Sequence, residues 1–567
     1  MTSRPRLAAW ALAAIVAGTA PGWAQDQSLP GAYLAGRQAL MANDFAAAAP
    51  FLATAVARDP DSALLRESLL LAQVALGRVG AALPVARQMM AAGQPSAVAQ
   101  IVILADQLDR GAWAEIAADQ PGRDTGALVD GLVAAWTQVG LGRMSEALSE
   151  FDALAQAQGL GAIARYHKAL ALASVGDFGG AEALLAEQAA SGLGMTRRGV
   201  RAHVEVLSQL DRHEDALELI DGVLATGGDP VLAALRDRVL AGEPLPFSLV
   251  QDPADGVAEV FFTVAMALAP EAGDTIALVY SRIAEHVRPD HVDARLLTAA
   301  LLEDLRQYDL ATAAYNEIPR SDPAFHAAEL GRADALYHGG RIDAAIEALE
   351  QLARSHADLP VVHTALGDML RREERFDAAS RAYDRAIALI ETPGEQHWAL
   401  FYSRGIAHER EKRWPQAEAD FRKALELRPG QPLVLNYLGY SYVERNENLD
   451  EALAMIEEAV AARPDDGYIT DSLGWVLYRL GRYDEAVGHM ERAAELMATD
   501  PIINDHLGDV YWAVGRRLEA QFQWRRALSF NPEPEDEHRI RRKLEVGLDA
   551  VLAEEGAPPL RVTLNGN

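Results

Sequence analysis

Small and apolar positions recur along this 567-residue chain with a period close to 34 residues. Apolar residues with helical spacing surround each of these positions, so each repeat is predicted to be a hairpin of two helices stacked on the next hairpin. The positions that fix the period are eight alanines spaced by 34 to 38 residues: Ala277, Ala311, Ala345, Ala379, Ala417, Ala452, Ala486 and Ala520.

One repeat shows how the pattern forms a hairpin. Small residues stand at Gly474 and Ala486, where the two helices are expected to approach most closely, and the bulkier Leu473 and Tyr483 fill the space around them. Gly481 follows the first helix, where a residue with positive φ is favoured. Residue size and turn chemistry therefore agree on one register.

These residues resemble those of tetratricopeptide repeats, and the resemblance covers almost all of the chain after residue 24. It implies an all-α fold, a solenoid (superhelix) of about fourteen helical hairpins. The first helices of the hairpins are expected to begin near Leu29, Ala63, Ala97, Leu128, Ala162, Arg197, Ala258, Val292, His326, Pro360, Trp398, Pro432, Gly467 and Pro501.

The repeats divide into a degenerate, alanine-rich array over residues 25–240 and a more regular array over residues 258–534. Between them, residues 241–257 contain three prolines and lack helical spacing. This segment is interpreted as a linker, either a hinge between two arms or a long loop in one continuous solenoid. Residues 535–555 are expected to form a helix that caps the last hairpin, followed by a tail over residues 556–567.

The first 24 residues have the features of a signal peptide. Arg4 and Arg6 precede a short apolar run, and Gly22 and Ala24 are small residues at the positions that a signal peptidase reads. Cleavage before Gln25 and a periplasmic location are therefore expected. An uncleaved membrane anchor is the alternative, but the run is short for a span, which needs roughly 20 residues, so we expect no stable membrane insertion.

Composition excludes several classes of function. The chain has no cysteine, which excludes disulfides, thiolate metal sites and a lipoprotein anchor. Its formal net charge is −30, from 52 basic and 82 acidic residues, and becomes −32 if Arg4 and Arg6 leave with the signal peptide. Such a surface repels phosphate backbones, so nucleic acid is not an expected partner.

No catalytic motif has a usable spacing. His213 and His408 are each followed by a glutamate but lack the second histidine that a zinc helix needs four residues later. The phosphate-binding Gly-Lys-Ser/Thr sequence and the Gly-x-Ser-x-Gly elbow are also absent. We therefore expect no enzyme activity, no catalytic residues, no cofactor and no metal.

The resemblance also implies a concave groove lined by the first helices of the hairpins. In this frame, aromatic and acidic residues interleave along the groove of the last repeats. Buried aromatic rings typically anchor protein interfaces, and the acids suit a basic segment. The alternative is that neighbouring first helices pack these rings against each other. The predicted protein-binding residues are Tyr402, Asn436, Tyr440, Asp471, Trp475, Tyr478, Asp505, Asp509 and Trp512.

Residues 436–444 and 471–482 resemble more closely a group of exported bacterial tetratricopeptide proteins, some of which are lipoprotein adaptors of a periplasmic carboxyl-terminal processing protease. Those lipoproteins carry an anchoring cysteine, which this chain lacks. The resemblance implies a scaffold or adaptor whose partner is a protein or peptide, such as that protease. The alternatives are an assembly scaffold for an outer-membrane or cell-wall complex and a glycan-binding module that uses Trp475 and Trp512.

Overall fold

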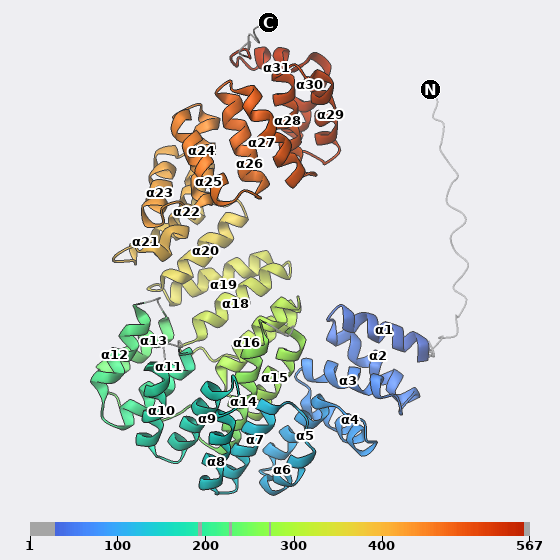
Figure 1. Ribbon diagram of the computed structural model, residues 1–567, viewed down its shortest axis with the longest axis vertical. Coiled ribbons are helices and arrows are strands. Elements are labelled where there is room, and N and C mark those ends of the chain that lie inside the picture. The colour runs from blue at the N-terminus through green and yellow to red at the C-terminus, as the bar shows by residue number, and fades with distance from the viewer. Residues whose placement is uncertain (1–28, 191–194, 226–228, 271–273, 561–567) are drawn as a thin grey trace, which may run out of the picture. The chain divides into compact units, whose positions relative to one another are not determined.

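The computed structural model describes residues 29–190, 195–225, 229–270 and 274–560, and within these ranges it contains helices and no strand (Figure 1). The described residues divide into two compact units, one up to residue 348 and the other from residue 349. The predicted signal peptide, residues 1–24, lies outside the described residues, as do residues 561–567 of the predicted tail.

The first unit contains the amino-terminal helices. It also contains a short 3-10 helix, η1 (Gln120–Gly122), and a second 3-10 helix, η2 (Glu395–His397), lies in the other unit. The α-helices are α1 (Leu29–Met41), α2 (Phe45–Arg58), α3 (Ala63–Ala75), α4 (Val79–Ala91), α5 (Ala97–Asp109), α6 (Trp113–Asp119), α7 (Ala127–Gly140), α8 (Met144–Ala155), α9 (Gly161–Ser174), α10 (Phe178–Ala190), α11 (Arg197–Gln209), α12 (His213–Leu224), α13 (Pro230–Leu240), α14 (Pro253–Leu268), α15 (Asp274–Val287), α16 (Val292–Asp304), α17 (Tyr308–Asn316) and α18 (Phe325–His338).

The division between the units falls within α19 (Ile342–Ser355). The helices that follow are α20 (Pro360–Arg372), α21 (Phe376–Ala388), α22 (Trp398–Arg410), α23 (Trp414–Leu427), α24 (Pro432–Arg445), α25 (Leu449–Ala462), α26 (Gly467–Arg479), α27 (Tyr483–Leu496), α28 (Pro501–Ala513), α29 (Arg517–Leu528), α30 (Pro534–Val546) and α31 (Leu548–Glu554).

The solenoid of helical hairpins is confirmed. Of the fourteen expected first helices, thirteen begin within one residue of the predicted position, and the exception is α14, which begins at Pro253 rather than Ala258. All eight alanines that fix the period have 0% of their surface exposed. Because a buried alanine leaves no side chain beyond Cβ, it lets the two helices of a hairpin approach closely.

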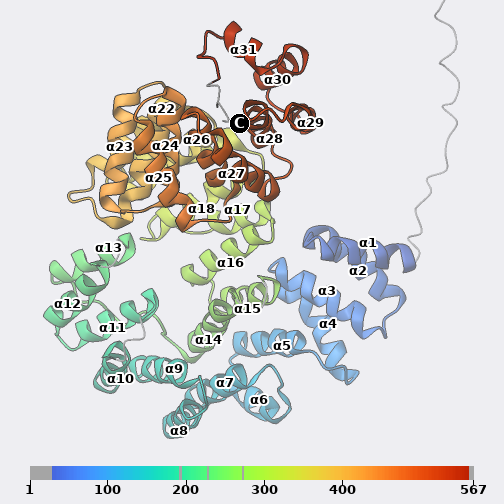
Figure 2. The ribbon, with the colours of Figure 1, turned by 45° about the horizontal axis from the view of Figure 1, so that its top comes forward.

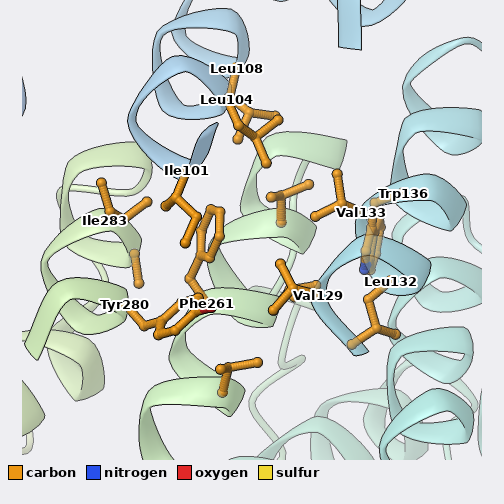
Figure 3. Packing of buried hydrophobic residues seen from close by; sticks show 14 of the residues in the cluster. Ile101, Leu104, Leu108, Val129, Leu132, Val133, Trp136, Phe261, Tyr280 and Ile283 are labelled. Atoms are coloured by element: carbon orange, nitrogen blue, oxygen red, sulfur yellow. The ribbon is translucent and has the colours of Figure 1, made fainter. Parts of the chain in front are cut away.

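Hairpins in the first unit contact more than their neighbours in sequence. Helix α14 packs against α7 and α9, and α15 packs against α3 and α5 (Figure 2). Figure 3 shows the resulting core, where Ile101 of α5, Trp136 of α7 and Phe261 of α14 meet. A Cβ atom at Gly256 would lie 2.4 Å from the ring of Trp136, so the close approach of α14 to α7 requires glycine there.

The segment after α13 does not separate two compact units. Leu245, Leu249 and Val250 are each 1% exposed, and Leu245 accepts a hydrogen bond at its carbonyl oxygen from Gln209 Nε2 at 2.6 Å. These contacts hold residues 241–252 within the first unit, where they connect α13 to α14 as a packed loop. The predicted domain boundary at residues 241–257 therefore differs from the observed division, which lies about a hundred residues later.

The predicted capping helix over residues 535–555 is two helices, α30 and α31, separated at Gly547. Gly547 has φ of +85°, a conformation that favours glycine, and a Cβ atom there would lie 2.6 Å from the ring of Trp512. The chain therefore turns sharply at this position against α28. No helix among the described residues is long and apolar enough to span a membrane.

Candidate functional site

The candidate site lies on the first helices of four consecutive hairpins in the second unit: α22, α24, α26 and α28. Helix α26 contacts both α24 and α28, so the first helices lie side by side. The amino-terminal ends of three of these helices are fixed by local residues. Pro432 and Pro501 occupy the first turns of α24 and α28. The carboxylates of Asp466 and Asp500 accept backbone hydrogen bonds as the N-caps of α26 and α28. This arrangement presents one row of side chains from each helix.

A cavity of about 520 Å³ opens along this row, and we call it the groove cavity. It brings together Asn436, Tyr440 and Asp471 of the predicted set. Of its aromatic and aliphatic side chains, Tyr468 at 55% and Ile502 at 48% are well exposed. The remaining lining residues are Glu409, Arg410, Tyr437, Ser441, Glu444, Ser472, Asp500 and Ile503.

The groove cavity is acidic. Four carboxylates line it, those of Glu409, Glu444, Asp471 and Asp500, against the single cation of Arg410. Each carboxylate has at least one donor from its own unit: Tyr437 Oη donates to Glu409 at 3.2 Å, Trp475 Nε1 donates to Glu444 at 2.9 Å, and His506 Nδ1 lies 3.0 Å from Asp471 Oδ2. The residual field favours a positively charged ligand.

Aromatic and amide groups complete the cavity. Burial, with the neighbouring carboxylates of Glu444 and Asp471, raises the pKa of Tyr440, so its hydroxyl stays protonated and can donate a hydrogen bond. The Oδ1 atom of Asn436 is buried and accepts no hydrogen bond from the described residues. An unpaired buried acceptor is costly in free energy.

Trp475 and Tyr478 lie inside the unit rather than on an open surface. Both are 8% exposed. The Trp475 ring stacks on that of Tyr478, with centroids 4.8 Å apart, and on that of His506, with centroids 4.0 Å apart. For these two residues the structure favours the alternative that neighbouring first helices pack the rings against each other.

Asp505, Asp509 and Trp512 are covered by the terminal helices. Lys543 of α30 binds both carboxylates, at 2.7 Å from Asp505 Oδ2 and 2.7 Å from Asp509 Oδ1, and Trp512 Nε1 donates to Asp549 of α31 at 2.9 Å. The expectation that these three residues face an open groove is thereby corrected, because α30 and α31 occupy that surface. Trp475 and Trp512 accordingly do not form an open platform for a sugar.

Tyr402 is half-buried and does not line the groove cavity. Its ring packs edge-on against Tyr437, with centroids 5.9 Å apart, and against Phe421 at 6.0 Å. It therefore supports the wall that Tyr437 forms. The predicted residues separate into three that line one cavity, five that are buried or covered and one that lies behind the wall.

Two important residues were outside the predicted set. Tyr437 lies three positions before Tyr440, and only the folded structure shows that its hydroxyl reaches Glu409. Lys543 could have been found, because it stands on the same helical face as the apolar Ile540 and Leu544, where a lone lysine indicates a buried charge pair. Among the residues that the structure describes, no group of three or more histidine, aspartate or glutamate side chains could hold a metal ion.

Comparisons with known proteins agree with this architecture. A family model described as tetratricopeptide repeat matches residues 301–360, 364–432 and 438–501, which include most of the groove cavity. A tetratricopeptide repeat-containing protein of Pseudomonas aeruginosa is 28% identical over 159 residues, which are 28% of this chain and 26% of that protein. The match therefore spans about a quarter of the relative.

Among solved structures, a chain of the Cut9–Hcn1 hetero-tetramer of APC/C is similar with a TM-score of 0.38 and 14% identity, over 92% of this chain and 96% of that chain. A tetratricopeptide repeat protein from Parabacteroides merdae is similar with a TM-score of 0.36 and 16% identity, over 45% of this chain and 98% of that chain. Residues 301–360, 364–432 and 438–501 are thus similar to tetratricopeptide repeats, and the helices of this part of the chain form hairpins.

Proposed function

We propose that this chain is a non-enzymatic scaffold that binds a basic segment of a partner protein in the groove cavity. The observation that supports this most strongly is the combination, in one cavity, of four carboxylates with the exposed Tyr468 and Ile502. Exposed charges steer an oppositely charged segment to the surface, and a ring and an aliphatic side chain then bury its apolar part.

The cavity offers a distinct partner for each part of such a segment. A lysine or arginine side chain would be attracted by Glu444 and Asp471. Tyr468 can pack against the stem of a long side chain, because its ring is largely exposed. A carboxylate-ended peptide would instead be repelled by the four acids.

Site-specific photo-crosslinking in the bacterium tests this proposal. A photoreactive residue at position 468 should crosslink to one defined protein, and one at Leu518, which is 72% exposed on α29 and does not line the cavity, should not. Glu444→Gln combined with Asp500→Asn should weaken the crosslink at position 468 and reduce its salt dependence. No crosslink at position 468, or equal crosslinking at both positions, would contradict the proposal.

We further propose that the scaffold acts in the periplasm as an adaptor of an envelope protease. The amino-terminal sequence, with Arg4, Arg6 and the small residues before Gln25, supports export, and the resemblance of residues 436–444 and 471–482 supports the protease. Protein recovered from the periplasm should begin at Gln25. Identification of the crosslinked partner by mass spectrometry distinguishes a protease from a component of an outer-membrane or cell-wall assembly complex, which would replace this proposal.

A further inference from the structure

The groove cavity shares one of its carboxylates with a buried histidine. Asp471 of α26 lines the cavity, and Nδ1 of His506 on α28 lies 3.1 Å from its Oδ1 and 3.0 Å from its Oδ2. The side chains of Asp471 and His506 are 8% and 11% exposed. Asp471 therefore contacts both the cavity and a buried ring that can ionise.

A tryptophan connects the same histidine to a second carboxylate of the cavity. The ring of His506 stacks on that of Trp475, with centroids 4.0 Å apart and planes inclined by 13°. Nε1 of Trp475 donates to Glu444, which lines the groove cavity. Because the face of an aromatic ring attracts a cation, this stack and the contact with Asp471 both favour the protonated form of His506.

The acids on the same helix as His506 are bound by other cations. Asp505 and Asp509 of α28 also attract a positive charge on His506. Both are paired with Lys543 of α30, and Arg539 of α30 lies 3.8 Å from Asp505 and 3.6 Å from Asp509. The effect of these two acids on His506 is therefore largely offset by α30.

Asp471 is paired differently from these acids. Among the residues that the structure describes, its ion pair is with the histidine and with no lysine or arginine. Tyr440 of α24 neighbours both Asp471 and Glu444. Helices α27 and α29, which also pack on α28, present carboxylates that are paired with Arg516, those of Glu491 and Glu519. The charge that Asp471 offers to the cavity is therefore set by the histidine.

We propose that binding of a basic segment in the groove cavity is linked to the release of a proton from His506, so that acidification releases the partner. This inference rests on the proposed function, in which a lysine or arginine of the partner lies near Asp471. That cation and the protonated His506 interact with the same carboxylate and repel each other. Binding of the segment therefore favours the neutral histidine.

The direction of the pH dependence follows from these charges. Burial opposes the charge of His506 in the free protein, but Asp471 outweighs burial and raises the pKa of His506 above its usual 6.5. A cation in the cavity offsets Asp471 and lowers this pKa again, so the complex holds fewer protons than the free protein. Affinity should therefore rise as pH increases through the pKa of His506 in the free protein.

Calorimetric titration of the full chain tests the linkage, with the capped peptide acetyl-Lys-Leu-Lys-Leu-Lys-amide as the probe. The lysines of this peptide remain charged between pH 6 and 9. Its affinity should rise by about threefold or more over this range. Titrations in phosphate and in Tris, which differ in ionisation enthalpy, should show that binding near neutral pH releases a fraction of a proton to the buffer.

Two histidine variants locate the proton. His506→Gln should remove the pH dependence of peptide binding, because glutamine keeps an N–H donor but cannot be protonated. His538→Gln, at an exposed position on α30, should keep it. Circular dichroism checks that each variant remains folded. A His506→Gln variant that retains the full pH dependence would overturn the proposal.

A cation introduced into the cavity tests the same linkage without a ligand. Tyr468 lines the cavity three positions before Asp471 and is 55% exposed, so a lysine can replace it without entering the core. NMR titration of carbon-13-labelled histidine measures the pKa of His506. This pKa should be lower by about half a pH unit or more in Tyr468→Lys than in the uncharged control Tyr468→Gln.

The outcomes separate this proposal from the proposed function. The same His506 pKa in both Tyr468 variants would overturn the linkage. Peptide binding that does not change with pH would also overturn it and would leave the proposed function in place. Absence of peptide binding at every pH, with a lowered His506 pKa in Tyr468→Lys, would instead contradict the proposed function and, with it, the release of a partner by acid.

Discussion

The ammonium nitrogen of Lys543 lies 2.7 Å from Oδ1 of Asp509, and the two side chains are 0% and 1% exposed. The same nitrogen also binds Asp505 at 2.7 Å. One buried cation thus joins the terminal helix α30 to α28, which is the first helix of the last hairpin. Two of the acids that the sequence offered to a basic partner, Asp505 and Asp509, are thus paired with a lysine of the same chain.

Lys543→Met should therefore destabilise the second unit. Removing one member of a buried charge network leaves the remaining charges uncompensated, which costs about 3–5 kcal/mol. Urea denaturation should show this loss, and adding Asp505→Asn and Asp509→Asn to the variant should restore part of it. Lys423→Met is the matched control, because Lys423 pairs on the surface with Glu426. Unfolding of Lys543→Met at the urea concentration of the parent would contradict the assigned role.

Two glycines in the second unit should respond oppositely to alanine. A Cβ atom at Gly508 would lie 2.4 Å from Nε1 of Trp524, whereas a Cβ atom at Gly488 meets nothing within 4 Å. Gly508→Ala should cost about 1–3 kcal/mol through overpacking. Gly488→Ala should stabilise by about 0.5–1 kcal/mol, because alanine is the better helix former. Urea denaturation of both variants measures the difference, and equal effects would show that the hairpin register is wrong.

Two aromatic residues of α26 should separate stability from binding. Trp475 is 8% exposed and stacked between helices, so Trp475→Ala should cost about 3–5 kcal/mol of unfolding free energy. Tyr468 is 55% exposed, so Tyr468→Ala should change stability by no more than about 0.5 kcal/mol. Tyr468→Ala should nevertheless weaken partner binding. A stable Trp475→Ala variant, or a Tyr468→Ala variant with full partner binding, would argue against this division.

The stability of the second unit should fall as pH rises above about 6.5. Burial opposes the charge of His506, but Asp471 outweighs burial and raises the pKa of His506 above its usual 6.5. A histidine with a raised folded-state pKa contributes stability below the unfolded value, and this contribution is lost as pH rises through the folded value. Thermal unfolding between pH 6 and 9 measures it.

His506→Gln should lose this part of the pH dependence, and His538→Gln, at an exposed position on α30, should keep it. A parent protein and a His506→Gln variant with the same slope would show that the His506–Asp471 pair does not contribute.

Local regularity made the hairpins predictable. The alanine period and the caps lie within single repeats, so the beginnings of α24, α26 and α28 could be read directly from Pro432, Gly467 and Pro501. Helix ends and the small residues at hairpin contacts depend on neighbours within about 34 residues. A repeat pattern contains this information because each hairpin must pack on the next.

The candidate site was predictable only in part. The repeat frame placed Asn436, Tyr440 and Asp471 on one face, and the structure brings them into one cavity. The same frame could not show that Trp475 is stacked on His506 or that Tyr468 remains exposed. The exposure of a side chain depends on which side chains of the adjacent helix fill the space beside it. The repeat frame predicts which face of its helix a residue occupies, but it does not predict which side chains pack against that residue.

By itself, the sequence determined the helical hairpins, their register and the row of aromatic and acidic residues on the first helices. Only the tertiary structure decided that α14 and α15 pack back onto α3, α5 and α7, and that Lys543 pairs with Asp505 and Asp509. The physical reason is that hairpin formation depends on residues close in sequence. Burial and charge pairing depend instead on helices that meet only when the chain has folded.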